Sequence, residues 1–186
     1  CLRDSRGRGR SGPGLWRLPG SPVVAYATLR ALLVALGDWV VRGAEPPASQ
    51  VPRVADGTLV PSWPQASVGF PQIPGVTFNG RLHEGDAWDF GDQFTPGVLN
   101  AVPPVRLGAP YPALVPKTDA DGIDIAGIHQ VEVAVPLATF TGWALRAGAA
   151  SGDGCDDAGQ QIDFAPTRAA RLAAGDPRLS LDERYP

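Results

Sequence analysis

The chain has 186 residues, a formal net charge of −3 and two cysteines. This length is sufficient for one domain with a hydrophobic core. The small net charge gives no strong attraction to nucleic acid or to an anionic membrane, and no apolar run is long enough to span a bilayer. We therefore expect no nucleic-acid partner and no membrane partner. We also expect no cofactor.

The composition combines signs of order and of irregular structure. The 23 glycines and 20 prolines approach the level typical of low-complexity chains. However, 44% of the residues are apolar and five are tryptophan, so we expect ordered loops rather than disorder. Cys1 and Cys155 fit no metal-binding or redox spacing, and we expect two free thiols.

Residues 1–20 are rich in arginine and glycine and show no hydrophobic periodicity. The arginines are Arg3, Arg6, Arg8, Arg10 and Arg17. One interpretation is an arm that contacts phosphates and stacks on bases. No aromatic residue lies within the R-G-R-G-R run, and we favour a disordered terminus.

Residues 22–41 are predicted to form the longest helix of the chain. Ser21 suits the N-cap, Pro22 the first helical position and Gly43 the C-terminal cap. Apolar side chains recur at spacings of three and four on one face of this helix; they are Leu29, Leu32, Leu33, Leu36, Trp39 and Val40. This face needs a broad apolar partner, and the candidate strands of the chain are short and broken by proline. We therefore expect part of the partner sheet to lie outside the chain.

Residues 45–74 are interrupted repeatedly by proline. Asp56-Gly57 predicts a turn between Val54 and residues 58–60, which would form a small hairpin. Ser67 lies in Q-A-S-V-G, which lacks the first glycine of the G-x-S-x-G nucleophile elbow. That glycine allows the strained strand-to-helix turn to close, so we do not assign Ser67 as a nucleophile.

Residues 75–116 are predicted to hold short extended pieces at 76–78 and 113–115. An acidic cluster in L-H-E-G-D-A-W-D-F-G-D comprises His83, Glu84, Asp86, Asp89 and Asp92. A metal site usually needs a second histidine or a cysteine at fixed spacing, and none is present. We favour a solvated loop with Trp88 and Phe90 packed beneath it.

Asp119, Asp121 and Asp124 follow the pattern D-x-D-G-x-D, and they are the candidate metal ligands of the chain. Calcium prefers several carboxylate oxygens that converge from one tight turn. The glycine comes two residues too early for an EF-hand loop. We favour a plain connecting turn.

His129 is the candidate catalytic residue, as a general base. Such a role needs an acidic group to orient it and a nucleophile beside it. The alternative is an exposed or hydrogen-bonded loop histidine. After His129 we predict two strands, one at 131–135 from its alternating valines and one at 137–143 after Pro136.

The C-terminal part contains helix signals. Residues 148–159 are predicted as a flexible acidic loop, and residues 166–174 as a short helix that packs Leu172 inward and ends at Gly175. Ser180 and Glu183 have the spacing of a capping box, which opens a further helix close to the last residue. Together with the absence of methionine, this leads us to expect a fragment of a longer protein.

Several segments, in this order, resemble the C-terminal part of the alpha/beta hydrolase domain-containing proteins of bacteria and fungi. They are residues 29–40 (L-R-A-L-L-V-A-L-G-D-W-V), 46–60, 71–76, 108–116, 119–128 (D-A-D-G-I-D-I-A-G-I), 133–146 and 164–185. The resemblance covers nearly everything after Pro19. Its specificity lies in length and order rather than in a catalytic motif.

This resemblance implies an α/β fold, in which a mostly parallel sheet carries helices on both faces. Residues 21–186 would be the incomplete C-terminal part of such a domain, with one long helix, loop-rich short strands and a short C-terminal helix. In the family's layout the serine nucleophile, the acid and the histidine precede the last core helix. The helix at 22–41 resembles that last helix, which implies that the chain lacks the nucleophile region.

We therefore predict the C-terminal segment of a serine-dependent, esterase-like α/β hydrolase that is inactive as an isolated fragment. Its partner would be the missing N-terminal part of its own domain, and the parent would act on a small-molecule ester. The alternative is a non-catalytic binding or structural module, stabilised by calcium through the three aspartates. A third interpretation places His129 or His83 in the active site of the intact parent.

Overall fold

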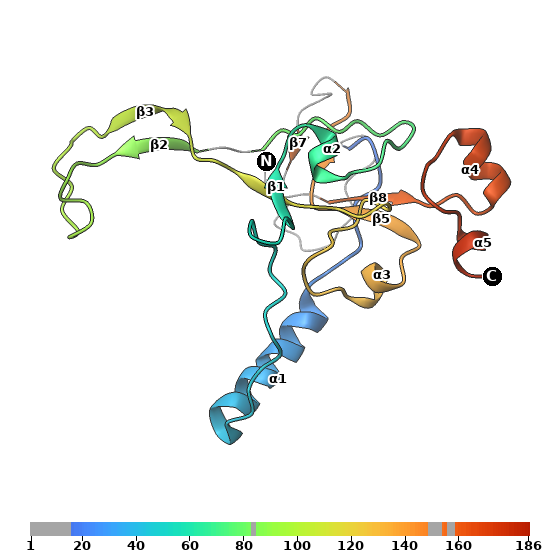
Figure 1. Cartoon of the computed structure of the whole chain (residues 1–186), viewed down its shortest axis with the longest axis horizontal. Coiled ribbons are helices and arrows are strands. Elements are labelled where there is room, and N and C mark those ends of the chain that lie inside the picture. Colours follow the sequence, from blue (N-terminus) through green and yellow to red (C-terminus); the bar gives the residue numbers. More distant parts are fainter. Residues whose placement is uncertain (1–15, 83–84, 149–153, 156–158) are drawn as a thin grey trace.

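The computed structural model describes residues 16–82, 85–148, 154–155 and 159–186 (Figure 1). Within these residues the strands form four separate two-stranded antiparallel sheets. The central pair is β5 (Ala138–Thr141) with β8 (Gln160–Asp163), in which Thr139 lies opposite Ile162. Three of the four residues of β5 are buried, so this pair runs through the interior of the protein.

The hydrophobic core lies where short elements from distant parts of the chain meet. Strand β1 (Leu59–Pro61) pairs with β4 (Leu114–Pro116), and the single-turn helix α2 (Gln65–Val68) follows β1. The buried residues of the core are Val68, Phe70, Ile73 and Ile162, with Leu18, Val60, Val76, Phe78, Val115 and Trp143 packed against them. The predicted extended piece at 113–115 thus becomes β4, and it stabilises the core through a long-range pairing.

The segment from Trp16 to Gly20 runs beside two of these strands. Trp16 forms a bridge with Arg146, and Gly20 forms one with Gln160. Strand β6 (Ala144–Leu145) pairs with β7 (Gly154–Cys155) nearby. Backbone contacts therefore attach residues 16–20 to these strands. Residues 1–15, Cys1 among them, and the Cys155 side chain are outside what is described, so the thiol prediction is not tested.

A long hairpin extends away from this core (Figure 1). It consists of β2 (Asp86–Asp89) and β3 (Val105–Pro110), with an irregular register between Asp86 and Trp88. All six residues of β3 are exposed. The prediction of an acidic loop here was wrong, because Asp86 lies within a strand and pairs across it with Arg106 at 2.5 Å. Trp88 remains 40% exposed instead of packing beneath a loop.

Helix α1 (Tyr26–Arg42) is the longest described helix, and it too projects from the core (Figure 1). Gly43 ends it with a left-handed φ of 70°, as predicted. Its start was predicted four residues too early, because the backbone N–H of Ser21 donates to the carbonyl of Gly159 and holds that segment extended. The helix begins only after the chain has left this contact, and its N-cap Ala25 provides no side-chain hydrogen bond.

Two further elements differ from the sequence prediction. The valines at 131–135 form the single-turn helix α3 (Val131–Ala134) rather than a strand. Gln130 is extended, and its carbonyl accepts the backbone N–H of Ala134. Backbone groups of this segment thus form hydrogen bonds with each other and need no partner strand. The turn at Asp56-Gly57 is present, but β1 pairs with β4 and not with Val54.

The C-terminal helices follow the predicted signals. Helix α4 (Arg168–Ala174) ends at Gly175, with Thr167 accepting the backbone N–H of Ala170 at its start. Helix α5 (Leu181–Arg184) has the predicted capping box of Ser180 and Glu183. Leu172 is 59% exposed, so its predicted inward packing was wrong.

Arg178 fastens this C-terminal region to the central strands. Its guanidinium donates to both carboxylate oxygens of Asp176, to Thr139 Oγ1 and to the carbonyls of Ile162 and Asp163, at 2.7 to 3.0 Å. Arg178 is only 2% exposed. Burial opposes the ionisation of Asp176, but the hydrogen bonds from Arg178 outweigh it and hold the pKa of Asp176 below its usual value.

The described residues thus combine helices and strands, in agreement with a mixed α/β class. The parallel sheet implied by the resemblance is not found among them, where every strand pairing is antiparallel. No helix in the described part of the chain is long and apolar enough to cross a membrane.

We predict that Arg178→Met lowers the free energy of unfolding by about 3–5 kcal/mol, because it leaves the Asp176 carboxylate buried without its partner. Urea unfolding followed by circular dichroism measures this loss. The matched control is Arg168→Met, since Arg168 also pairs with a carboxylate but its side chain is 70% exposed. The control should change the stability by about 0–1 kcal/mol. Equal losses for the two variants would contradict this assignment.

Candidate functional site

A pocket of about 220 Å³ opens beside the core. Its walls come from α2, β4, β5, β6 and the loops between them, so it is built from residues far apart in the sequence. They are Ser62, Val68, Phe70, Phe78, Asn79, Gly80, Arg81, Leu82, Val115, Pro116, Thr118, Gly122, Asp124, Phe140, Thr141, Gly142, Trp143, Ala144 and Leu145. Most of these are apolar or small, and a few polar groups stand among them, which is the usual composition of a ligand site.

Three aromatic rings form one wall of the pocket. Phe70 stacks on Phe78 with ring centroids 5.6 Å apart, and Trp143 meets both rings edge-on at 5.6 and 5.7 Å. Such pairs stabilise each other by about 0.5–1.5 kcal/mol beyond the area that they bury. The wall is therefore held in place by its own packing.

A tight turn at Asp119 to Ile123 contributes Gly122 to the lining. Asp119 Oδ1 accepts the backbone N–H groups of Asp121 and Ile123 at 2.9 and 3.0 Å. Gly122 has φ +75°, and a Cβ atom there would lie 2.9 Å from the Phe70 ring and 3.0 Å from Thr139. Only glycine suits both this backbone conformation and this close approach.

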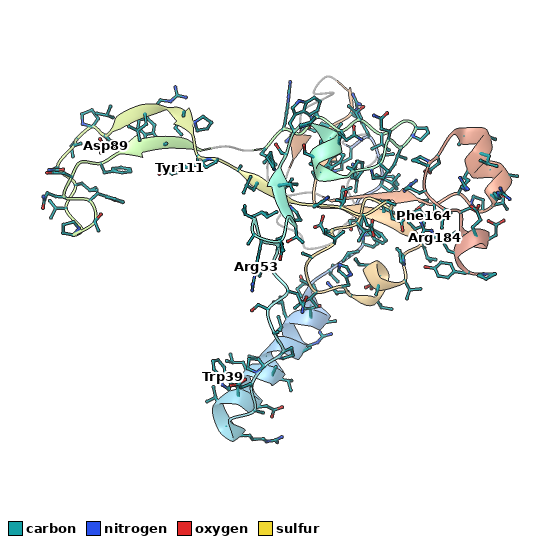
Figure 2. All side chains as sticks on the ribbon, viewed as in Figure 1. Trp39, Arg53, Asp89, Tyr111, Phe164 and Arg184 are labelled. Carbon is teal, nitrogen blue, oxygen red and sulfur yellow. The ribbon has the colours of Figure 1, made fainter. Side chains whose placement is uncertain are left out.

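The turn is also tied to the C-terminal helix α5. Arg184 Nη1 donates to Asp121 Oδ2 at 2.7 Å, and its second amino group donates to the other carboxylate oxygen. The same guanidinium lies over the Phe164 ring at 4.1 Å, and Figure 2 labels the two residues side by side. Two chain segments are thereby joined by a bidentate, charge-assisted contact.

Asp124 is the carboxylate that lines the pocket. Burial of its carboxyl group raises the pKa to about 6; the negative charge of Asp119 also raises it, while His129 opposes the shift. Asp124 retains an exposed surface as well, so it stands at the mouth of the pocket rather than within the core. His129 is beside it, with Nε2 2.8 Å from the Asp124 backbone carbonyl oxygen.

The three candidate metal ligands therefore have separate partners. Asp119 caps its own turn, Asp121 pairs with Arg184, and Asp124 faces the pocket. Within the described residues no group of three or more His, Cys, Asp or Glu side chains is arranged to hold a metal ion.

The other candidates lie apart from this turn. Ser67 is within the single-turn helix α2 and not at a strand-to-helix turn. His83 and Glu84 lie outside the described residues. In the same acidic cluster, Asp89 accepts the Gly91 backbone N–H and Asp92 accepts the Asn100 side chain. These carboxylates stabilise turns of the hairpin.

Two features of this region were not predicted from the sequence. The first is the ion pair of Arg178 with Asp176, although D-P-R next to a helix end places both charges close together. The aromatic wall joins Phe70, Phe78 and Trp143, and no local pattern connects residues so far apart. Among the features of the pocket, the sequence indicated only the turn at residues 119–123, because Asp119-x-Asp121-Gly122 predicts a tight loop with a positive φ.

Comparison with known proteins then identifies the family. A family model described as "Alpha/beta hydrolase domain" matches residues 5–186. The chain belongs to the alpha/beta hydrolase domain family. No curated protein and no solved structure matches the chain. The resemblance found in the sequence is thus confirmed, and the match also includes most of the arginine-rich segment.

For this α/β hydrolase domain chain we predict that Gly122→Ala destabilises more than Gly175→Ala. Both glycines have a positive φ, 75° and 72°, but nothing lies within 4 Å of the Cβ position at Gly175. The backbone strain costs each variant about 1–2 kcal/mol. Contact with Phe70 and Thr139 adds about 1–3 kcal/mol at Gly122 alone. Equal urea midpoints for the two variants would show that the turn does not pack as described.

A second prediction concerns pH. The folded-state pKa of Asp124 is about 6, above its usual value of 3.8. Between pH 4 and pH 6 the folded protein binds more protons at this group than the unfolded chain, so its contribution to stability falls as pH rises. We expect Asp124→Asn to gain stability relative to the unchanged protein across this window, with no further gain above it. Urea unfolding at several pH values tests this, and a difference that does not vary with pH contradicts it.

Proposed function

We propose that this chain is the C-terminal segment of a serine-dependent, esterase-like α/β hydrolase, and that it completes the domain rather than hydrolysing esters alone. The membership of the family supports the hydrolase class. The observation that carries the proposal is the uncovered apolar face of helix α1.

Helix α1 has no buried residue. Its apolar face is exposed along its whole length, from 57% at Leu29 and 42% at Leu32 to 76% at Val40. Figure 2 shows Trp39 on this projecting helix, well away from the core. Soluble proteins rarely expose so continuous an apolar surface without a partner.

Physical arguments favour a partner that belongs to the same domain. Burial of such side chains stabilises by about 1.5–3 kcal/mol each, and helices in proteins owe most of their stability to tertiary packing. In a doubly covered sheet, an apolar helix face packs against the strands. We assign this face of α1 to the missing N-terminal part of the domain, whose sheet it would cover.

The catalytic groups belong to that same missing part in our proposal. The resemblance places nucleophile, acid and histidine before the helix that α1 resembles. His129 is the one histidine within the described residues, and its Nε2 is directed at a backbone carbonyl oxygen rather than at a serine. The substrate of the complete enzyme would be a small-molecule ester, attacked by the serine of the parent protein.

The alternative is a non-catalytic module stabilised by calcium at Asp119, Asp121 and Asp124. Two of these carboxylates already have partners, Asp119 in its turn and Asp121 with Arg184. A thermal midpoint that rises with calcium and falls with chelator would favour this module. We expect no change.

The test of the proposed function is an ester-hydrolysis assay. We expect the protein encoded by the full upstream reading frame to hydrolyse a p-nitrophenyl ester. The isolated chain should give only the background rate, because it lacks the nucleophile. Changing the upstream G-x-S-x-G serine to alanine should abolish the activity of the full protein.

Control variants test whether residues of this chain take part in ester hydrolysis. His129→Ala in the full protein should leave turnover within about twofold, since this histidine makes no contact with a nucleophile in our proposal. Hydrolysis by the isolated chain that disappears with His129→Ala would overturn the proposal. So would a full protein that has an elbow serine but shows no activity towards any ester.

A further inference from the structure

The pocket lined by Asp124 is a site that the proposed function does not use. No residue of α1 lines it. Its walls consist of described residues between Ser62 and Leu145, held by the aromatic wall and by the turn at Gly122. The pocket can therefore hold a ligand with groups of this chain alone, whether or not the proposed hydrolase function is correct.

The size of the pocket limits the ligand to a small molecule. A cavity of about 150 Å³ with apolar walls takes up benzene. The 220 Å³ here leaves room for one aromatic ring and a short chain. Phe70, Phe78, Phe140 and Trp143 offer the ring a matching surface, since aromatic pairs favour edge-on and offset contacts.

The polar group that fixes the ligand is the Asp124 carboxylate. It is the one carboxylate in the lining, and no hydrogen bond or ion pair within the described residues engages it. A carboxylate beside apolar walls loses hydration without compensation unless a partner is supplied. An ammonium group would supply a charge-assisted hydrogen bond, and it would also be attracted to the face of the nearby tryptophan.

The charged groups around Asp124 favour a cation on balance. Asp119 contributes a second negative charge to its surroundings, whereas His129 contributes in the opposite sense. Arg81 also lines the pocket and is exposed. Since Arg81 could instead attract an anion, the test compares ligands of both charges.

We propose that this pocket is a binding site for a small aryl-alkyl amine, whose ring packs against Phe70, Phe78 and Trp143 and whose ammonium group pairs with Asp124.

Calorimetric titration of the whole chain at pH 7.5 tests this with three ligands of similar shape. They are 2-phenylethylamine, 2-phenylethanol and 3-phenylpropionate. We expect the amine to bind at least about tenfold more tightly than the alcohol, because only the amine forms a charged hydrogen bond. The carboxylate should bind most weakly.

Variants of single residues test whether the ligand binds in this pocket. Asp124→Asn should lower the affinity for the amine to that for the alcohol and leave the alcohol unchanged. The matched control is Asp163→Asn, because Asp163 is also exposed but does not line the pocket; it should change neither affinity. Ala144→Leu, which fills the pocket, should weaken all ligands about tenfold or more in a protein whose thermal unfolding remains cooperative.

Several outcomes would overturn the proposal. They are equal affinities for amine and alcohol, tightest binding of the carboxylate, no binding of any of the three, and an amine affinity that Asp124→Asn does not change. None of these outcomes depends on ester hydrolysis by the parent protein, so the two proposals can fail separately.

Discussion

The packing of the C-terminal region against the central strands depends on one buried cation, the guanidinium of Arg178. Arg178 binds Asp176 and donates to Thr139 and to two carbonyls of β8, so it connects the C-terminal helices with the central strand pair. Thr139 in turn donates to the Asp121 carbonyl, which belongs to the turn that lines the pocket. A buried ion pair contributes less to net stability than its geometry suggests, because both charges lose hydration. We infer that it favours this arrangement over others mainly because another arrangement would leave a buried charge without a partner.

The sequence predicted the helices that are determined by residues close to one another in the chain. The stripe of leucines and Trp39 indicated α1, and the Ser180 to Glu183 spacing indicated the capped turn of α5. The same reasoning failed at residues 131–135, because β-branched residues form strands only where a partner strand is available. It also started α1 too early, since the contact of Ser21 with Gly159 is made across the whole chain. The pocket could not be predicted for the same reason: its aromatic wall is assembled from distant segments.

The protein thus has one region whose buried polar groups mostly find partners within the chain, and two elements whose apolar side chains remain exposed. In the central strands and the C-terminal helices, buried polar groups such as those of Thr139, Asp176 and Arg178 have partners from this chain, whereas Gln160 Nε2 has none within the described residues. Helix α1 and strand β3 instead project from the core (Figure 1) and expose nearly all of their apolar side chains. In a member of the alpha/beta hydrolase domain family, this contrast supports a division of labour. In our proposal the chain contributes a covering helix and a small-molecule pocket, and the nucleophile would come from a preceding part of the same domain.

The central claim is that the apolar face of α1 is a contact surface for the rest of its domain. Amide hydrogen exchange of residues 26–42, measured in the isolated chain and in the full-length protein, tests this most directly. We expect exchange within seconds to minutes in the isolated chain, where packing does not protect the helix, and at least about a hundredfold slower exchange in the full-length protein. Equal and rapid exchange of the helix in both proteins would contradict the account.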